Sequence, residues 1–312
     1  MDLSLVILFI INFIQHLILE VNGDCTWPTE FNSNQWHDSS RGILTFGTKS
    51  MQGWTFQPTS TLTVNSWDCV SVSTYSTDGR ILLITSQPFS LFSTNYYAYL
   101  CITVTKITES SYSYYINHEI QHNVNFERAF IYPANNLTDH NTICSNSGAS
   151  GGEYQMLVKE GSEFAAKVHC PWHFLGQYGY THTTSDAVTT CDQSSSKIST
   201  CTNTQHMKFD YIACATKVAY SVSDTLWCIN NVVEGETNYV MVFNGNDASS
   251  LIDNQSIYRF TCIAVSGDVT KASVSPRYCQ KDQTPALFPR TSSGQTIGAL
   301  LSFAPASLTC RK

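Results

Sequence analysis

The twelve cysteines constrain the fold of this chain more than any other feature, because all of them lie beyond an apolar N-terminal segment. An even number of cysteines behind an export signal is typical of a disulfide framework formed in an oxidising compartment. We therefore expect a secreted, extracellular protein in which every cysteine is paired. The cysteines are Cys25, Cys69, Cys101, Cys144, Cys170, Cys191, Cys201, Cys214, Cys228, Cys262, Cys279 and Cys310.

Residues 1–23 have the character of a signal peptide. Residues 3–19 are almost wholly apolar, but three polar residues leave a continuous apolar core that is too short to span a bilayer. Val21 and Gly23 are small residues ahead of a cleavage site that would leave Asp24 as the mature N-terminus. No later stretch approaches the length of a membrane span, so we expect no stable membrane insertion.

The charge balance excludes some classes of partner. The formal net charge is −7, and loss of the two acidic residues in the signal segment leaves −5. A mildly acidic surface argues against a nucleic-acid partner. Two sequons, at Asn136 and Asn254, have no proline at their middle position and predict N-linked glycans.

Three landmarks occur twice along the chain and predict an internal duplication. The first is a cysteine followed by Trp and Pro, then Phe and Gln-aromatic; the second is a Trp just before a cysteine; the third is a β-branched strand through a cysteine. They pair Cys25 with Cys170, Cys69 with Cys228, and Cys101 with Cys262. We expect a first β-domain over residues 24–150 and a related second domain over 151–312. The interval between the first and second landmarks is longer in the second half than in the first, which predicts an insertion at about 185–215.

The duplication divides the cysteines into two even sets, so each half can be oxidised without a bridge to the other. The first set contains the four cysteines before residue 150, and the second contains the remaining eight. Cys144 and Cys310 are the expected closing cysteines of the two halves. Connectivity inside each set stays open, but Cys191 with Cys201 is the first choice, because ten Ser/Thr-rich residues readily close a hairpin.

Short segments rich in Val, Ile, Thr, Tyr and Phe alternate with Gly, Asn, Asp and Ser along the mature chain. The β-branched and aromatic segments are typical of strands, and the Gly, Asn, Asp and Ser residues between them are typical of turns. No long stretch shows the periodicity of a helix. Residues 74–84 predict a hairpin around Asp78 and Gly79. The expected fold is all-β: two tandem antiparallel domains, each a lipocalin-like β-barrel or a sandwich.

At these landmarks the chain resembles a family of invertebrate secreted, cysteine-rich proteins made of tandem domains of unknown function. The resemblance covers essentially the whole mature chain and implies a disulfide-stapled fold, but it supplies no catalytic residues. It is carried by Cys25-Thr-Trp-Pro28 with Trp36, by residues 101–115, by Cys170-Pro-Trp-His-Phe174 through Tyr178, by residues 199–203 with Phe209, Tyr211 and Cys214, and by Tyr258 through Cys262.

Two catalytic motifs occur in unsuitable contexts. His118-Glu119-Ile-Gln-His122 matches a zinc-protease motif, which requires a helix, yet a strand-like segment precedes it and no third ligand follows at a fitting spacing. Gly148-Ala-Ser-Gly-Gly152 matches the nucleophile motif of serine hydrolases, but it lacks the buried strand before it and the helix after it. We therefore expect no catalytic residue, no metal site and no cofactor.

The leading hypothesis is a secreted, glycosylated protein with a non-catalytic binding or structural role. Its partner would be an extracellular protein, a glycan or a small hydrophobic ligand. A first alternative is a lipocalin-like carrier with a hydrophobic ligand inside a barrel, walled by Trp36, Trp54 and Tyr178. A second alternative is a zinc-dependent hydrolase that uses His118 and His122 as ligands and Glu119 as general base.

Overall fold

The computed structural model describes residues 25–134, 143–144, 153–245 and 257–310, and these residues form an all-β protein. Two short 3-10 helices, η1 (Glu163–Ala166) and η2 (Trp172–Phe174), lie between two groups of strands. The strands are β1 (Gln35–Asp38), β2 (Gly42–Phe46), β3 (Ser50–Thr59), β4 (Leu62–Thr74), β5 (Gly79–Ser86), β6 (Phe89–Leu91), β7 (Thr94–Thr108), β8 (Ser111–Ile116), β9 (Phe130–Pro133), β10 (Gln155–Lys159), β11 (Gly176–Thr184), β12 (Thr189–Thr190), β13 (Lys197–Ser199), β14 (His206–Phe209), β15 (Thr225–Glu234), β16 (Thr237–Phe243), β17 (Phe260–Ser266), β18 (Lys271–Pro276), β19 (Ala299–Phe303) and β20 (Leu308–Thr309).

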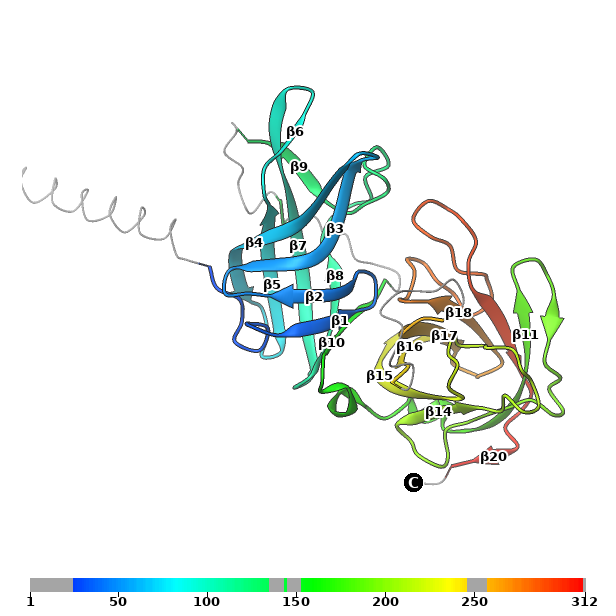
Figure 1. Cartoon of the computed structure of the whole chain (residues 1–312). Helices are drawn as coiled ribbons and strands as arrows, with labels where there is room; N and C mark the ends of the chain where they lie inside the picture. The colour runs from blue at the N-terminus through cyan, green and yellow to red at the C-terminus, as the bar shows by residue number, and fades with distance from the viewer. Residues whose placement is uncertain (1–24, 135–142, 145–152, 246–256, 311–312) are drawn as a thin grey trace, which may run out of the picture.

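The first group of strands closes into an eight-stranded antiparallel barrel. Each strand pairs with the next along the chain, in the order β1, β2, β3, β4, β5, β7, β8 and β10, and β10 pairs back with β1. The short strands β6 and β9 pair only with the first residues of β7, which is fifteen residues long and extends beyond the barrel. Figure 1 shows this extension at the end of the barrel where β6 and β9 are labelled.

The second group repeats the same plan. Strands β11, β13, β14, β15, β16, β17, β18 and β19 pair in chain order, and β19 returns to β11 to close the barrel. The first barrel runs from blue through cyan to the green of β10, and the second from green to red (Figure 1). Both halves are therefore closed barrels, which leave no edge strand in the barrel wall itself. Of the two architectures that the sequence left open, the structure has the barrel and not the sandwich.

Equivalent cysteines occupy the same register in the two barrels. Cys69 on β4 lies opposite Ile84 on β5, and the residue before Ile84 lies opposite Cys101 on β7. Cys228 and Cys262 hold the corresponding positions on β15 and β17 relative to β16. The ladder also shifts register immediately after Cys69 and again after Cys228. A shared strand order, register and bulge position support the predicted duplication.

The expected domain limits need two corrections. Strand β10 lies past residue 150, yet it supplies the last strand of the first barrel by pairing with both β1 and β8. The segment 185–215 is not an insertion in the barrel wall, because it contains β13 and β14, the second and third strands of the second barrel. Its greater length comes from the β11–β12 hairpin and from the loop that contains Cys214.

All twelve cysteines are paired, and no disulfide joins the two halves, as the even division of cysteines predicted. The predicted pair Cys191–Cys201 is wrong, because these residues lie on opposite sides of β13 and each reaches a more distant partner. Cys310 is likewise not the counterpart of Cys144, since Cys279 fills that role. The disulfides are Cys25–Cys69, Cys101–Cys144, Cys170–Cys228, Cys191–Cys214, Cys201–Cys310 and Cys262–Cys279.

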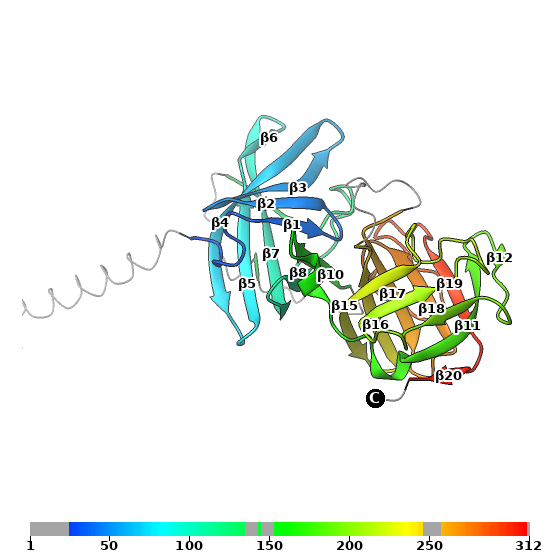
Figure 2. The same ribbon diagram turned by 60° about the horizontal axis from the view of Figure 1, so that its bottom comes forward.

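The two barrels pack against each other through a buried apolar cluster. The alternation of a strand places Leu157 of β10 inside the first barrel and its neighbours Met156 and Val158 outside it. These two outward side chains pack on the outer face of β15, β16 and β17, where Phe243 is also fully buried. Both views place β10 on the side of the first barrel that faces the second (Figure 1, Figure 2). Burial on both faces explains the apolar run in β10.

Within the part of the chain that the structure describes, no helical segment is long and apolar enough to cross a bilayer.

Candidate ligand-binding cleft between the barrels

A cleft of about 670 Å³ lies beside this contact, between the two barrels. Ligand sites for small molecules typically have volumes of ~300 to 1,000 Å³ and often lie at domain interfaces. The first barrel contributes the β1–β2 turn, the end of β8 with the loop that follows it, and the start of β10. The second barrel contributes the long connection between β18 and β19.

Arg41 anchors one side of the first wall. Its guanidinium makes two hydrogen bonds to the carboxylate of Glu127, at 3.0 Å from Nη1 and 2.6 Å from Nη2. Nη1 also donates to the carbonyl of Thr55, and the guanidinium lies 4.8 Å above the ring of Trp54. Burial alone would lower the pKa of Arg41, but the hydrogen bonds and the charge of Glu127 raise it above the ordinary value. Arg41 is therefore a fixed positive charge at the cleft.

A second bidentate pair lies deeper in the same wall. Arg128 donates to the Glu153 carboxylate through Nε at 3.1 Å and Nη2 at 2.6 Å, and its side chain is only 7% exposed. The remaining Nη1 donates to the carbonyl of His118. One guanidinium thus joins the loop after β8 to the segment that leads into β10. A planar arginine fork suits this bridging role because its donors have fixed directions.

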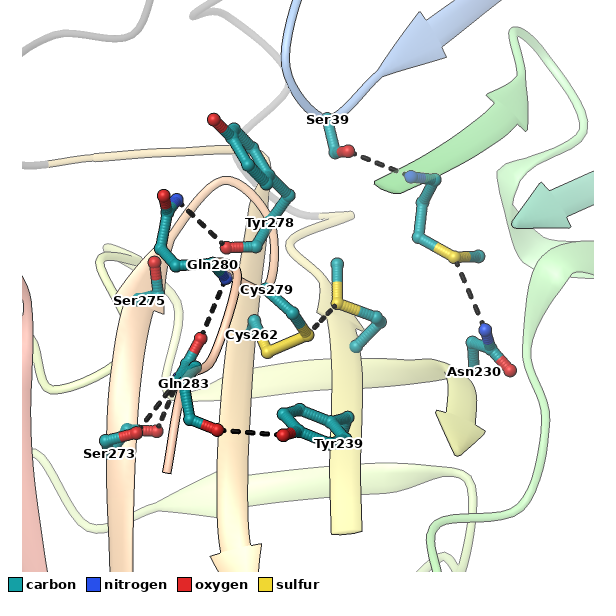
Figure 3. Close-up of a disulfide and its surroundings, with 12 residues drawn as sticks. Ser39, Asn230, Tyr239, Cys262, Ser273, Ser275, Tyr278, Cys279, Gln280 and Gln283 are labelled. Carbon is teal, nitrogen blue, oxygen red and sulfur yellow. Dashed lines mark hydrogen bonds between the residues drawn. A yellow bond between two sulfur atoms is a disulfide. The ribbon is translucent and has the colours of Figure 1, made fainter. Parts of the chain in front are cut away.

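The Cys262–Cys279 disulfide holds the wall that the second barrel provides (Figure 3). Cys279 lies three residues after the end of β18, so the bridge ties the start of the loop to β17. Four residues later, the Gln283 amide donates to the Ser273 hydroxyl at 3.0 Å, and its backbone carbonyl accepts the Tyr239 hydroxyl at 2.8 Å. Gln283 is 2% exposed. The loop is fixed at both points before any ligand arrives.

Tyr278 lies where the two walls meet. Its neighbour Cys279 donates a backbone hydrogen bond to the carbonyl of Tyr154 in the first barrel, at 3.2 Å. In Figure 3 the Tyr278 ring points away from the β18 strand that precedes it. Burial, followed by the negative charge of Glu153, raises the pKa of Tyr278. The phenol therefore stays neutral at physiological pH and can donate a hydrogen bond.

The cleft is positively charged although the chain is acidic. Four of the seven arginines of the whole sequence line it, together with one lysine, against three carboxylates. All three carboxylates are already engaged: Glu127 by Arg41, Glu153 by Arg128, and Asp282 by Lys281 at 2.9 Å. The excess positive charge is carried by the second wall. The cationic lining residues are Arg41, Arg128, Arg277, Lys281 and Arg290.

The HExxH-like segment does not form the helical zinc site that the hydrolase alternative requires. Residues 117–127 form bends and turns, with an isolated bridge between Gln121 and Glu127. The His118 ring packs edge-on against Phe130, whereas the ring of His122 packs edge-on against Phe126. No group of three metal-ligating side chains occurs in the described part of the chain. The helix that the hydrolase alternative requires is therefore absent from these residues, and the backbone does not place the two imidazoles on one helical face.

The other residues singled out from the sequence have different outcomes. Trp36 and Trp54 are buried in the core of the first barrel, where a cavity of only about 20 Å³ is left, room for about one water molecule. Tyr178 stacks on Phe174 inside the second barrel. A hydrophobic ligand would have to displace such side chains to enter the barrels. The sequons at Asn136 and Asn254, residues 1–23 and the Gly148–Gly152 motif lie outside the described residues.

The residues of the cleft could not be identified from the sequence by motif. They come from four separate segments, and no two of the four arginines are closer than thirteen positions in the chain. One signal was nevertheless present. Arginine is scarce in this chain, with seven occurrences, and four of them line the cleft. Only the packing of one barrel on the other brings these positions together.

Comparison with known proteins gives one match. Residues 166–290 match the family model described as Domain of unknown function (DUF7042). The matched segment runs from the end of η1 to the loop before β19, and it contains three complete disulfides, Cys170–Cys228, Cys191–Cys214 and Cys262–Cys279. This match confirms the expected resemblance to a domain of unknown function for the second half of the chain. No curated protein and no solved structure matches the chain.

Proposed function

We propose that this protein is an extracellular, non-catalytic binding protein whose ligand occupies the cleft between the two barrels. One observation carries the proposal: a preformed cleft of about 670 Å³ combines charged, amide and aromatic side chains from both barrels. A largely preformed concave site with a few fixed polar groups is the usual arrangement of a ligand site.

The chemistry of the lining favours binding over catalysis. General acid or base catalysis needs a group that is free to exchange a proton with the substrate. The three carboxylates of the cleft instead accept hydrogen bonds from arginine or lysine, and two of them do so in bidentate pairs. Such pairs hold the shape of a site and present fixed charge to a ligand.

The proposed extracellular setting rests on the disulfides. Six disulfides in one chain fit a protein that folds in an oxidising compartment. We propose that residues 1–23 direct export, that Asp24 becomes the mature N-terminus, and that Asn136 and Asn254 carry glycans. Peptide mapping of protein from the culture medium, with and without an N-glycosidase, tests all three points. An intact Met1 on the exported protein would refute the cleavage.

A variant that fills the cleft tests the location of the ligand. Thr284 lines the cleft, so Thr284→Trp should obstruct it, whereas Thr77 is exposed in the β4–β5 turn and Thr77→Trp is the matched control. The assay is an array of neutral and acidic saccharides together with native mass spectrometry for co-purified molecules. Ligands retained by the wild type and by Thr77→Trp should be lost by Thr284→Trp. A ligand retained equally by all three proteins would place the binding site outside the cleft.

A further inference from the structure

Resting on the cleft as the binding site, we infer that its ligand is an anionic saccharide, a sugar chain bearing carboxylate or sulfate groups. Two independent features of the lining point to such a ligand: the concentration of positive charge in an acidic chain, and the kind of polar group that the walls present.

The charge pattern selects an anion. Five cationic and three anionic side chains line the cleft, whereas the chain as a whole carries −7. Low-dielectric walls concentrate the field of such a charge excess inside a cleft and attract ligands of opposite sign. Arg290 is exposed on the rim, and Arg277 lies on the same loop of the second barrel. An acidic ligand therefore meets positive charge on the wall opposite the Arg41–Glu127 and Arg128–Glu153 pairs.

The choice of arginine over lysine in the lining also favours an anionic ligand. Four of the five cationic lining residues are arginines, although lysines outnumber arginines ten to seven in the sequence. The guanidinium plane presents parallel N–H donors that match the oxygens of a carboxylate, phosphate or sulfate group. Lysine would provide attraction of equal sign without this directional match. The enrichment in arginine thus points to an oxyanion with fixed geometry.

Polar groups without partners point to hydroxyl groups on the ligand. Two buried atoms of the first wall, the donor Arg41 Nε and the acceptor Gln155 Oε1, have no hydrogen-bond partner among the described residues. A buried polar atom without a partner costs about 1 to 3 kcal/mol. A hydroxyl both donates and accepts, so sugar hydroxyls match the hydrogen-bonding character of both atoms. The rings of Phe126, Tyr278 and Phe288 supply apolar faces beside them.

An acidic peptide fits the same walls less well. Extended peptides usually gain affinity by pairing their backbone with an exposed strand edge. The barrel strand at the base of the cleft, β10, already pairs on both sides, with β1 and with β8. The opposite wall is the loop of residues 277–296, whose tip closes on itself through the Arg290–Thr296 bridge. Recognition in this cleft therefore depends on side chains, which suits a saccharide.

Calorimetric titration of the oxidised, mature protein with three probes tests the inference. The probes are a sulfated heparin hexasaccharide, the same hexasaccharide after removal of its sulfates, and a hexaglutamate peptide. The test variant is Arg277→Gln with Arg290→Gln. The matched control is Lys208→Gln with Lys271→Gln, which removes the same charge at exposed positions outside the cleft. Thermal unfolding of each variant confirms that the fold is kept.

We expect the sulfated hexasaccharide to bind the wild type and the control alike, and to bind the cleft variant at least about tenfold more weakly, with affinity falling as salt rises. The desulfated probe keeps its carboxylates but carries less negative charge, so it should bind the wild type and the control more weakly than the sulfated probe does. Equal binding of the sulfated probe to the cleft variant, or no binding to the wild type, would overturn the inference. Tighter binding of hexaglutamate would assign the cleft to an acidic peptide. If the wild type does not bind the sulfated probe, or binds hexaglutamate more tightly, the Thr284→Trp comparison still tests separately whether the cleft is the binding site.

Discussion

The Cys262–Cys279 disulfide should stabilise the second barrel and also hold the wall of the cleft. Replacing both cysteines by alanine separates these two roles, because a second bridge in the same barrel offers a matched control. Cys191–Cys214 spans 23 residues and Cys262–Cys279 spans 17, so the two close loops of similar length. Cys191 and Cys214 do not line the cleft.

Loop length sets the expected magnitude. Restricting the unfolded chain with a loop of about 20 residues contributes roughly 3 kcal/mol to the free energy of unfolding. Both Cys262 and Cys279 are fully buried, so losing their two sulfur atoms leaves a small cavity that adds about 1 kcal/mol. We therefore expect a loss of about 4 kcal/mol for Cys262→Ala with Cys279→Ala. The control, Cys191→Ala with Cys214→Ala, should lose about 3 kcal/mol.

Two measurements on the purified variants separate the roles. Denaturant unfolding gives the stability of each protein, and hydrogen–deuterium exchange reports on the loop of residues 277–297. Exchange in that loop should rise strongly in the Cys262/Cys279 variant and little in the control, because only the first bridge ties the loop to β17.

Two results would refute this reasoning. A stability within about 0.5 kcal/mol of the wild type in both variants would mean that these bridges do not restrict the unfolded chain as loop entropy requires. A similar rise in exchange across residues 277–297 in both variants would mean that the loop responds to global stability alone. The cleft wall would then not depend on its own disulfide.

Three further outcomes follow from the structure. Met156→Ala removes a fully buried side chain between the barrels and should lower the free energy of unfolding by about 2 to 4 kcal/mol, against less than about 0.5 kcal/mol for the exposed Val233→Ala in denaturant titrations. Burial, followed by the charge of Arg259, lowers the pKa of His37 below its ordinary value of about 6.5, so the folded state prefers neutral His37. Its contribution is present above pH ~6.5 and is lost as pH falls towards the folded pKa; His37→Gln should reduce the drop in melting temperature over that interval. A chelator should leave the melting temperature unchanged, since the rings of His118 and His122 pack on different aromatic side chains; a fall would show a structural metal.

Much of the fold could be predicted from local pattern. The hairpin expected at residues 74–84 is present, since β4 ends at Thr74 and β5 begins at Gly79. These segments could be recognised because β-branched and aromatic residues favour strands, and Gly, Asn and Asp favour turns, through short-range effects.

The errors arose where partners are distant in sequence. Cys201 lies ten residues from Cys191 but bridges to Cys310, 109 residues away, because β20 returns the C-terminal segment to the start of β11. Likewise, the segment 185–215 appeared to be an insertion, because sequence length cannot show which residues pair into a barrel wall. Neither proximity could be inferred without the strand order.

The sequence by itself determined the strand-forming segments, the even division of the cysteines between two related halves and the resulting fit to an oxidising compartment. Each of these depends on residue type and on spacing along the chain. Only the tertiary structure decided the disulfide partners, the closure of each barrel and the cleft where Arg41 and Arg128 face Arg277 and Arg290. The physical reason is that barrel closure and barrel packing join residues more than a hundred positions apart, through apolar burial that no local pattern encodes.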